Sequence, residues 1–374
     1  MKKYFFVFVL ILAMSGFVGF AQNSVVEDFK PSTVNQPGKE YPMVNSEGRV
    51  RVQIKAPGAT KVQLDISAVK YDLKKDTAGV WIGESAPQDE GFHYYQLWVD
   101  GAAVPDPGSL YFYGASRWGS GIEIPAKDQD FYANKNVPHG QVIEKIYYSK
   151  VNDAMRRCFI YTPPGYNKDI QKRYPVLYLQ HGGGENETGW AAQGKAGLIM
   201  DNLIAEGKAV PFIIVMDNGT WSMQGPPRGE RPAGGEWPPK GWADGFTKTL
   251  LKDIIPMVDA EYRTIADQQH RAMAGLSMGG METHTITLNR PDVFAYYGLL
   301  SGGTYKPEEI KGKANPKLIF ISCGSRENPD AVKKAAVDLN AAGIKAVSYV
   351  SENTAHEFQT WRRSLRELAP LLFK

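Results

Sequence analysis

From residue 143 onward, short apolar runs alternate with longer stretches of helical periodicity, and this alternation limits the possible folds more than any other feature. Near-continuous apolar strands separated by helices form a mostly parallel sheet with helices on both faces. The predicted strands are 157–161, 175–180, 212–216, 271–276, 296–300, 317–322 and 346–350, and the predicted helices are 198–207, 246–262, 279–289, 331–343 and 359–372. We therefore predict an α/β domain over residues 136–374.

The preceding part of the chain has a different pattern, in which short stretches alternate apolar and polar residues and end at turn signals. The predicted strands are 49–57, 61–67, 79–84 and 92–101. Several short strands at regular spacing are typical of a small β-sandwich. We predict that this sandwich belongs to a first domain over residues 22–135, in which a linker-like stretch follows Asp106.

The N-terminus carries Lys2 and Lys3, then an apolar run over residues 4–20, then Ala21. A basic start, a short apolar stretch and small residues near its end are typical of a secretory signal. We predict cleavage after Ala21 and export to the periplasm or the extracellular space, with no membrane attachment afterwards. The alternative is a retained anchor, for which the apolar run is at the short limit of a membrane span.

Charge and cysteine content exclude some classes of function. The formal net charge is +3, and Lys2 and Lys3 supply two of these units. A nucleic-acid partner would need a concentrated basic surface, so we predict none. Cys158 and Cys323 lie in apolar, strand-like runs. We expect two buried free thiols, and a disulfide between them is the alternative.

The sharpest local motif is Gly-Leu-Ser-Met-Gly-Gly at residues 275–280, which follows an apolar strand and opens a helical stretch. This is the context that a G-x-S-x-G nucleophile elbow requires. The strand-to-helix turn leaves no room for side chains at Gly275 and Gly279. It exposes the hydroxyl group of Ser277 at the start of the helix. We predict Ser277 to be a catalytic nucleophile.

A serine nucleophile needs a base, and in this class of fold the order along the chain is serine, acid, histidine. Only His284 and His356 follow Ser277. His284 lies about two turns into the helix that Ser277 opens and cannot fold back to it, so a packing or capping role is expected. His356 lies in a polar loop before the last helix and is the predicted base.

The acid must lie between Ser277 and His356, at the end of a strand. Glu327 follows the apolar run 317–322 and is the first choice. Asp330 is the alternative acid, although a carboxylate in the first turn of the next helix also stabilises that helix. The acid orients the histidine ring and stabilises its protonated form. Either carboxylate suits that role.

A glycine-rich turn at residues 180–184 follows the strand 175–180 and precedes the elbow in sequence. Such a turn presents backbone N–H groups without side chains in the way, as an oxyanion hole requires. We predict the Gly183 and Met278 N–H groups as its donors, with Gly182 as the alternative to Gly183. The sequence has no metal-ligand motif, and we predict no metal or other cofactor.

Substrate contacts are expected on the long loop after the strand 212–216. It carries Trp221, Trp237 and Trp242 among glycine and proline residues, at the catalytic end of the sheet. A loop of this length needs a reason to exist. The indole rings are suited to stacking on an aromatic acid or a sugar. The equally weighted alternative is that they fasten the loop to the domain.

These residues resemble carbohydrate esterase family 1, the esterase D type of α/β-hydrolase. The resemblance covers residues 145–374 and is carried by the segments 161–166, 174–190, 201–207, 251–263, 274–280, 320–327 and 356–362. It implies an α/β-hydrolase domain in which Ser277 and His356 match the nucleophile and the base of the family. Glu327 stands where that family usually has aspartate.

The front domain is similar to the immunoglobulin-like carbohydrate-binding module of glycogen-branching enzymes, at residues 56–65, 79–84 and 91–109. Such a module before an esterase D domain resembles two-domain bacterial feruloyl esterases. The resemblance implies a secreted serine esterase that releases ferulate or related hydroxycinnamates from feruloylated plant cell-wall polysaccharide. The alternatives are an acetyl-xylan esterase, a siderophore esterase of the enterochelin type, and a non-catalytic glycan-binding protein.

Overall fold

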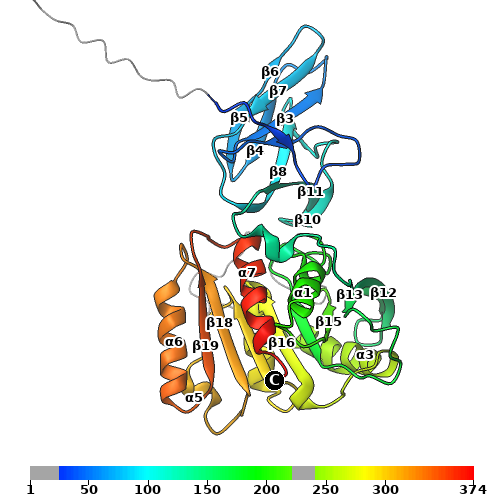
Figure 1. The fold of residues 1–374 in the computed structure, drawn as a ribbon, viewed down its shortest axis with the longest axis vertical. Helices are drawn as coiled ribbons and strands as arrows, with labels where there is room; N and C mark the ends of the chain where they lie inside the picture. The colour runs from blue at the N-terminus through cyan, green and yellow to red at the C-terminus, as the bar shows by residue number, and fades with distance from the viewer. Residues whose placement is uncertain (1–24, 221–240) are drawn as a thin grey trace, which may run out of the picture.

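The computed structural model describes residues 25–220 and 241–374. An all-β front part stands above a larger α/β part, and the helix α7 lies at the top of the larger part, facing the front part (Figure 1). The predicted signal at residues 1–21 lies outside the described residues.

The front part is a sandwich of two sheets. One has the strand order β1-β2-β3-β7-β6, and the other has the order β10-β11-β8-β4-β5, with β9 paired to β8. The strands are β1 Lys30–Pro31, β2 Met43–Val44, β3 Val50–Lys55, β4 Val62–Ile66, β5 Val69–Asp72, β6 Lys74–Lys75, β7 Val80–Glu84, β8 Gly91–Val99, β9 Ala102–Val104, β10 Tyr111–Gly114 and β11 Arg117–Ile124. The four predicted strands correspond to β3, β4, β7 and β8. A separate core that includes Val50, Leu64 and Ile122 fills the space between the sheets.

The prediction of a linker-like stretch after Asp106 is wrong, because this stretch contains the hairpin β10–β11. The sequence of β11 lacks the alternation of apolar and polar residues that predicts a strand, because glycines occupy positions 119 and 121. These glycines are needed for close packing. A Cβ at Gly119 would lie 2.0 Å from the Gln96 side chain, and one at Gly121 would lie 2.5 Å from Phe92.

The larger part is built on an eight-stranded sheet of order β12-β13-β15-β14-β16-β17-β18-β19. β12 and β13 form an antiparallel hairpin at one edge, β13 pairs with β15 antiparallel, and the remaining pairs are parallel. The strands are β12 Gln141–Ser149, β13 Ala154–Thr162, β14 Val176–Gln180, β15 Ile213–Met216, β16 Arg271–Leu276, β17 Tyr296–Leu300, β18 Leu318–Gly324 and β19 Ala346–Ser351. All seven predicted strands are present. β12 was not predicted, because this edge strand exposes the apolar residues Val142, Ile146 and Tyr148, so its sequence does not alternate polar and apolar residues.

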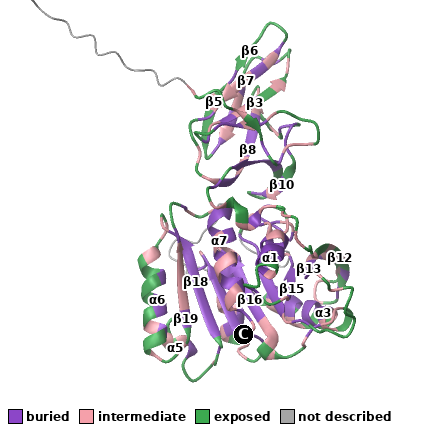
Figure 2. Cartoon of the chain, viewed as in Figure 1, coloured by how far each residue is buried: buried purple, intermediate pink, exposed green. Residues whose placement is uncertain are grey.

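Helices cover both faces of this sheet, as predicted. The helices are α1 Ala196–Ala205, α2 Asp244–Thr249, α3 Ile255–Glu261, α4 Met278–Asn289, α5 Pro307–Ile310, α6 Pro329–Ala341 and α7 Phe358–Leu368, with a π-helical turn Leu250–Ile254 between α2 and α3. One buried cluster packs α1 and α7 against the sheet. Another packs α2, α3, α4 and α6 against the opposite face. The central strands β14, β16 and β18 are therefore buried except for Arg271 at the start of β16 (Figure 2).

Two further observations concern the described residues. Cys158 on β13 and Cys323 on β18 are both buried and free, as expected. None of the helices in the ranges 25–220 and 241–374 is both long enough and apolar enough to span a bilayer.

Candidate active site

Ser277 lies at the turn between β16 and α4, with φ 51° and ψ −115°. This is a left-handed conformation that non-glycine residues rarely adopt. A Cβ at Gly275 would lie 2.3 Å from the Gly279 backbone, and a Cβ at Gly279 would lie 2.5 Å from the His181 carbonyl oxygen. The glycines of the motif are therefore required by close backbone contact, and the turn presents Ser277 at the carboxyl edge of the sheet.

His356 lies in the loop between β19 and α7, at hydrogen-bond distance from both predicted partners. Its Nε2 atom is 2.8 Å from Ser277 Oγ, and its Nδ1 atom is 2.7 Å from Glu327 Oε1. The structure thus brings together the predicted nucleophile, base and first-choice acid. The alternative acid, Asp330, is exposed in the first turn of α6. His284 is stacked on Tyr305.

The second carboxylate oxygen of Glu327 is also held. Oε2 accepts hydrogen bonds from Ser301 Oγ at 2.8 Å and from the Gly324 N–H at 2.6 Å. Burial opposes ionisation of Glu327, but the hydrogen bonds from His356, Gly324 and Ser301 outweigh it and hold the pKa of this carboxyl below its usual value. Glu327 is therefore an anion with a fixed orientation at neutral pH.

Ser301 and Trp361 complete this side of the site. The Trp361 indole N–H donates to Ser301 Oγ at 3.1 Å, and the ring meets His356 edge-on with centroids 5.1 Å apart. Trp361 is buried on α7. The contribution of Ser301 was not predicted. Its only sequence signal is its position directly after the apolar run of β17, on the strand beside the elbow.

The glycine-rich turn after β14 lies against the elbow. A Cβ at Gly182 would lie 3.3 Å from Ser277 Cβ, and a Cβ at Gly183 would lie 4.0 Å from Met278 Sδ. The Gly182 N–H donates to Glu185 Oε2 at 3.2 Å. Of the two glycines, Gly183 is thus the better candidate for the oxyanion hole, because the Gly182 N–H already has an acceptor.

The side chain of His181 holds this turn in place through two hydrogen bonds. The side chain is buried, Nδ1 is 2.8 Å from the Gly182 carbonyl oxygen, and Nε2 is 3.2 Å from the Gly219 nitrogen. These partners fix the tautomer, because Nδ1 must donate to the carbonyl and Nε2 must accept from the N–H group. Burial lowers the pKa of His181 below its usual value, so the ring is a neutral anchor.

A cavity of about 440 Å³ opens beside His356, between the two parts of the molecule. Its walls come from both parts: Ser67, Ala68, Phe92, His93, Tyr94 and Ala115 from the sandwich, and Gly183, Glu185, His356, Glu357, Phe358 and Trp361 from the α/β part. The sequence did not predict that residues of the sandwich line this cavity. The alternating pattern of β8 gives no sign that Phe92 and Tyr94 face a second domain.

Of the three tryptophans predicted to contact substrate, Trp242 is the one that lies among the described residues. Trp221 and Trp237 lie outside the described residues. Trp242 is half-buried in the turn before α2 and is not among the residues that line the cavity beside His356.

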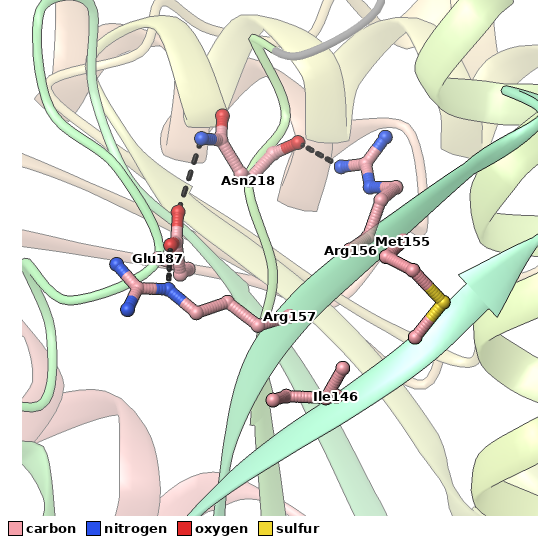
Figure 3. A pocket seen from close by; sticks show the side chains of 6 residues that line it. All are labelled: Ile146, Met155, Arg156, Arg157, Glu187 and Asn218. Carbon is pink, nitrogen blue, oxygen red and sulfur yellow. Dashed lines mark hydrogen bonds and ion pairs between the residues drawn. The ribbon is translucent and has the colours of Figure 1, made fainter.

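A second hollow of about 350 Å³ lies over the hairpin β12–β13 (Figure 3). Ile146 and Met155 form its apolar side. On its polar side, Arg157 Nε donates to Glu187 Oε1 and Asn218 Nδ2 donates to Glu187 Oε2. Because these polar groups satisfy one another, we assign no ligand to this hollow. Across the described residues, no cluster of three or more His, Cys, Asp or Glu side chains is arranged to hold a metal ion.

Comparison with known proteins agrees with this geometry. The family model described as Esterase matches residues 149–370. The chain belongs to this esterase family. It is 52% identical over 357 residues to an endo-1,4-beta-xylanase/feruloyl esterase of Xylanibacter ruminicola, which covers 93% of this chain and 48% of that protein. The esterase thus spans about half the length of this relative.

Solved structures show the same fold. A CE1 ferulic acid esterase from Anaeromyces mucronatus, in complex with ferulic acid, matches with a TM-score of 0.56 and 21% identity, over 66% of this chain and 96% of that one. The enterobactin esterase of Shigella flexneri, in the presence of enterobactin, matches with a TM-score of 0.59 and 16% identity, over 87% of this chain and 92% of that one. The α/β-hydrolase fold preceded by an all-β part is therefore confirmed.

Proposed function

We propose that this esterase is an exported serine carboxylesterase that releases ferulate or related hydroxycinnamates from feruloylated arabinoxylan. The observation that carries the proposal is the unbroken chain from Ser277 Oγ through the His356 ring to Glu327, with distances of 2.8 Å and 2.7 Å. Nucleophile, base and orienting acid at these distances are the arrangement that acyl transfer requires.

In the proposed mechanism, Ser277 Oγ attacks the ester carbonyl carbon while His356 Nε2 takes the hydroxyl proton. Glu327 holds the ring in the tautomer whose Nε2 can accept, and stabilises the imidazolium that forms. The Gly183 and Met278 N–H groups stabilise the oxyanion. The sugar oxygen then leaves with the proton from His356, and an acyl-enzyme remains. Water, deprotonated by His356, attacks this ester, and ferulate and free Ser277 are released.

The cavity beside His356 supports an ester with an aromatic acid and a sugar. Phe92 and Tyr94 of the sandwich and Trp361 of the α/β part offer aromatic surfaces within one cavity. The Xylanibacter relative is named as a xylanase and feruloyl esterase, and the Anaeromyces structure holds ferulic acid. We propose that the sandwich acts as a carbohydrate-binding module that positions the polysaccharide, and that the predicted cleavage after Ala21 precedes export.

A second candidate is a siderophore esterase. The enterobactin esterase of Shigella flexneri aligns with 87% of this chain, which includes much of the sandwich. An acetyl-xylan esterase or a non-catalytic glycan-binding protein has no comparable observation in its favour. A cyclic catecholate triester is the substrate that separates the siderophore hypothesis from the feruloyl one.

Hydrolysis of methyl ferulate, feruloylated arabinoxylan oligosaccharide, acetylated xylan and a cyclic catecholate triester tests the proposal. We expect the two ferulate esters to be hydrolysed fastest. Ser277→Ala and His356→Ala should each lower kcat about 10³-fold or more, because the two residues act as one unit. Faster release from the triester would favour the siderophore esterase, and retained activity in both variants would exclude this mechanism.

A further inference from the structure

The side chain of Glu185 is buried beside the catalytic residues but has no place in the proposed triad. The residue is 8% exposed, and it lines the cavity with Gly183 and His356. Burial of a carboxyl group costs several kcal/mol unless hydrogen bonds compensate for it. An apolar side chain would avoid this cost.

Glu185 is bound to Gly182 through both its main chain and its side chain. The Glu185 N–H donates to the Gly182 carbonyl oxygen at 3.2 Å, and Glu185 Oε2 accepts from the Gly182 N–H at 3.2 Å. His181 Nδ1 is a second donor to the Gly182 carbonyl oxygen. The peptide groups on both sides of Gly182 are therefore held in place.

The orientation of these peptide groups sets the direction of the Gly183 N–H. A trans peptide unit is planar, and its C=O and N–H groups point in opposite directions. When the Gly182 carbonyl oxygen is fixed toward His181 and Glu185, the Gly183 N–H must point the other way. No larger residue fits at position 182, because a Cβ there would lie 2.5 Å from Leu276 Cδ1. The turn must therefore be fixed by the neighbours of Gly182.

We propose that Glu185 is a positioning residue of the oxyanion hole: its side chain holds the peptide group that precedes Gly182, and thereby the orientation of Gly182 from which the Gly183 N–H is aimed at the developing oxyanion. This role rests on the proposed acyl-transfer function. A donor acts fully only when it is fixed before the reaction starts, and a small displacement removes much of its effect.

The charge state of Glu185 adds a measurable signature. Burial raises its pKa to about 7, while the Gly182 N–H and His356 act in the opposite direction. The titratable groups that face it are His356 and, from the sandwich, Tyr94, whose own pKa is raised by burial and by charge on Glu185. Glu185 lines the same cavity as Gly183, so a carboxylate here opposes the formation of an oxyanion bound by the Gly183 N–H. The neutral acid still accepts from the Gly182 N–H, so we expect kcat to decline as Glu185 ionises above pH 7.

The test compares Glu185→Ala and Glu185→Gln in the full chain, with methyl ferulate as substrate. Glu185→Ala removes the acceptor, and we expect kcat to fall about 10- to 100-fold with KM changed less than about threefold. Glu185→Gln keeps an acceptor oxygen at the same position. It should retain kcat within about threefold at pH 6 and lose the decline above pH 7.

Glu187→Ala is the matched control, because it removes a second buried carboxylate from the same loop. Glu187 binds Arg157 and Asn218 and has no contact with Gly182. It should lower the melting temperature as Glu185→Ala does, but leave kcat within about threefold.

Three results would overturn the role of Glu185: unchanged kcat in Glu185→Ala, an effect confined to KM, or equal loss of kcat in Glu187→Ala. If Glu185→Ala does not fold, the pH profile of Glu185→Gln decides, and an unchanged decline above pH 7 counts against the proposal. None of these results affects the proposed function, which fails if the ferulate esters are not the fastest substrates of the wild-type esterase, or if Ser277→Ala and His356→Ala both retain activity.

Discussion

The groups on the two sides of Ser277 are held in different ways. The acid side is Glu327 with its hydrogen-bond donors, and the oxyanion side is the glycine-rich turn at residues 180–184. On the acid side, Glu327 is fixed by Ser301 and Gly324, which belong to the same sheet that carries the nucleophile. On the oxyanion side, the Gly184 carbonyl oxygen accepts from the Ser116 N–H of the sandwich at 2.8 Å. The sandwich therefore binds the backbone of the loop that we propose to stabilise the oxyanion, whereas it meets the acid loop through side chains, in the ion pair of Asp89 with Arg326.

The contact with Gly184 comes from the tip of the hairpin β10–β11. Ala115 and Ser116 form its two-residue turn, and both have positive φ values of 50° and 63°. Such a turn is short and stiff because its backbone twist matches that of its strands. The front part is thus placed to influence the position of the backbone at Gly184.

A buried ion pair fixes the sandwich on the α/β part. Arg362 on α7 is fully buried and contacts Glu123 on β11 at 2.6 Å, and it also donates to the Gln193 carbonyl oxygen. Gln193 in turn donates to the hydroxyl group of Tyr94 on β8. The predicted oxyanion side of the site therefore packs on a buried interface, whereas the sandwich contacts the acid loop through the half-exposed ion pair between Asp89 and Arg326, the residue before Glu327.

Removal of the acid should have the largest effect on activity. Glu327→Gln leaves the His356 ring without a charge partner and free to adopt the wrong tautomer, so kcat should fall roughly 10⁴-fold at saturating methyl ferulate. Asp330→Asn is the control, since it removes only a helix-end charge worth about 0.3–1 kcal/mol. An inactive Asp330→Asn together with an active Glu327→Gln would reverse the assignment.

Disruption of the interface should have the next largest effect, on stability. Glu123→Ala leaves Arg362 buried without its carboxylate, and we expect the free energy of unfolding in urea to fall by about 3–5 kcal/mol. The double variant Glu123→Leu with Arg362→Met removes both charges and should recover most of this loss. If the single and the double variants are equally unstable, the cost lies in lost packing and not in an unpaired charge.

A change at the sandwich contact should have a moderate effect on catalysis. Gly184 has φ +79°, and a Cβ there would lie 3.3 Å from the Ser116 nitrogen. Gly184→Ala should lower kcat about tenfold, because the loop must shift away from the hairpin.

The matched control for this change is Gly165→Ala. Gly165 has the same φ of +79°, but a Cβ there would have nothing within 4 Å. Both variants should lose about 1–2 kcal/mol of stability through backbone strain, and only Gly184→Ala should lose activity. Equal kcat in the two variants would show that the sandwich does not influence the oxyanion side.

The smallest effect is expected at Ser301. Ser301→Ala removes one donor to Glu327 but leaves the Gly324 N–H in place, so kcat should fall roughly threefold.

The same variant should change how stability depends on pH. The folded-state pKa of Glu327 is lowered, so its ionisation stabilises the fold above the unfolded-state pKa, and this stability is lost as the pH falls through the folded-state pKa. Without Ser301 the folded-state pKa of Glu327 lies higher, so the stability lost in acid should be smaller and the loss should end at a higher pH. An unchanged acid limb in the unfolding profile would mean that Ser301 does not hold the charge.

The sequence predicts the parts of this molecule that depend on local patterns. The strands of the α/β sheet are continuous apolar runs, and the Ser277 elbow needs glycines that are visible in the sequence. β11 was missed because its glycines serve contacts with distant side chains such as Gln96 and Phe92. Glu185, Ser301 and the wall that the sandwich contributes to the cavity depend on how distant segments meet. A single sequence does not encode those contacts as a local pattern.

The most direct test of the account is the site of covalent labelling by a fluorophosphonate probe, located by peptide mass spectrometry. This probe reacts with serine side chains that are activated as nucleophiles. We predict one adduct, on Ser277, that is lost in Ser277→Ala and strongly reduced in His356→Ala and Glu327→Gln. Absence of labelling in the wild-type esterase, or an adduct that persists in Ser277→Ala, would contradict the proposed mechanism.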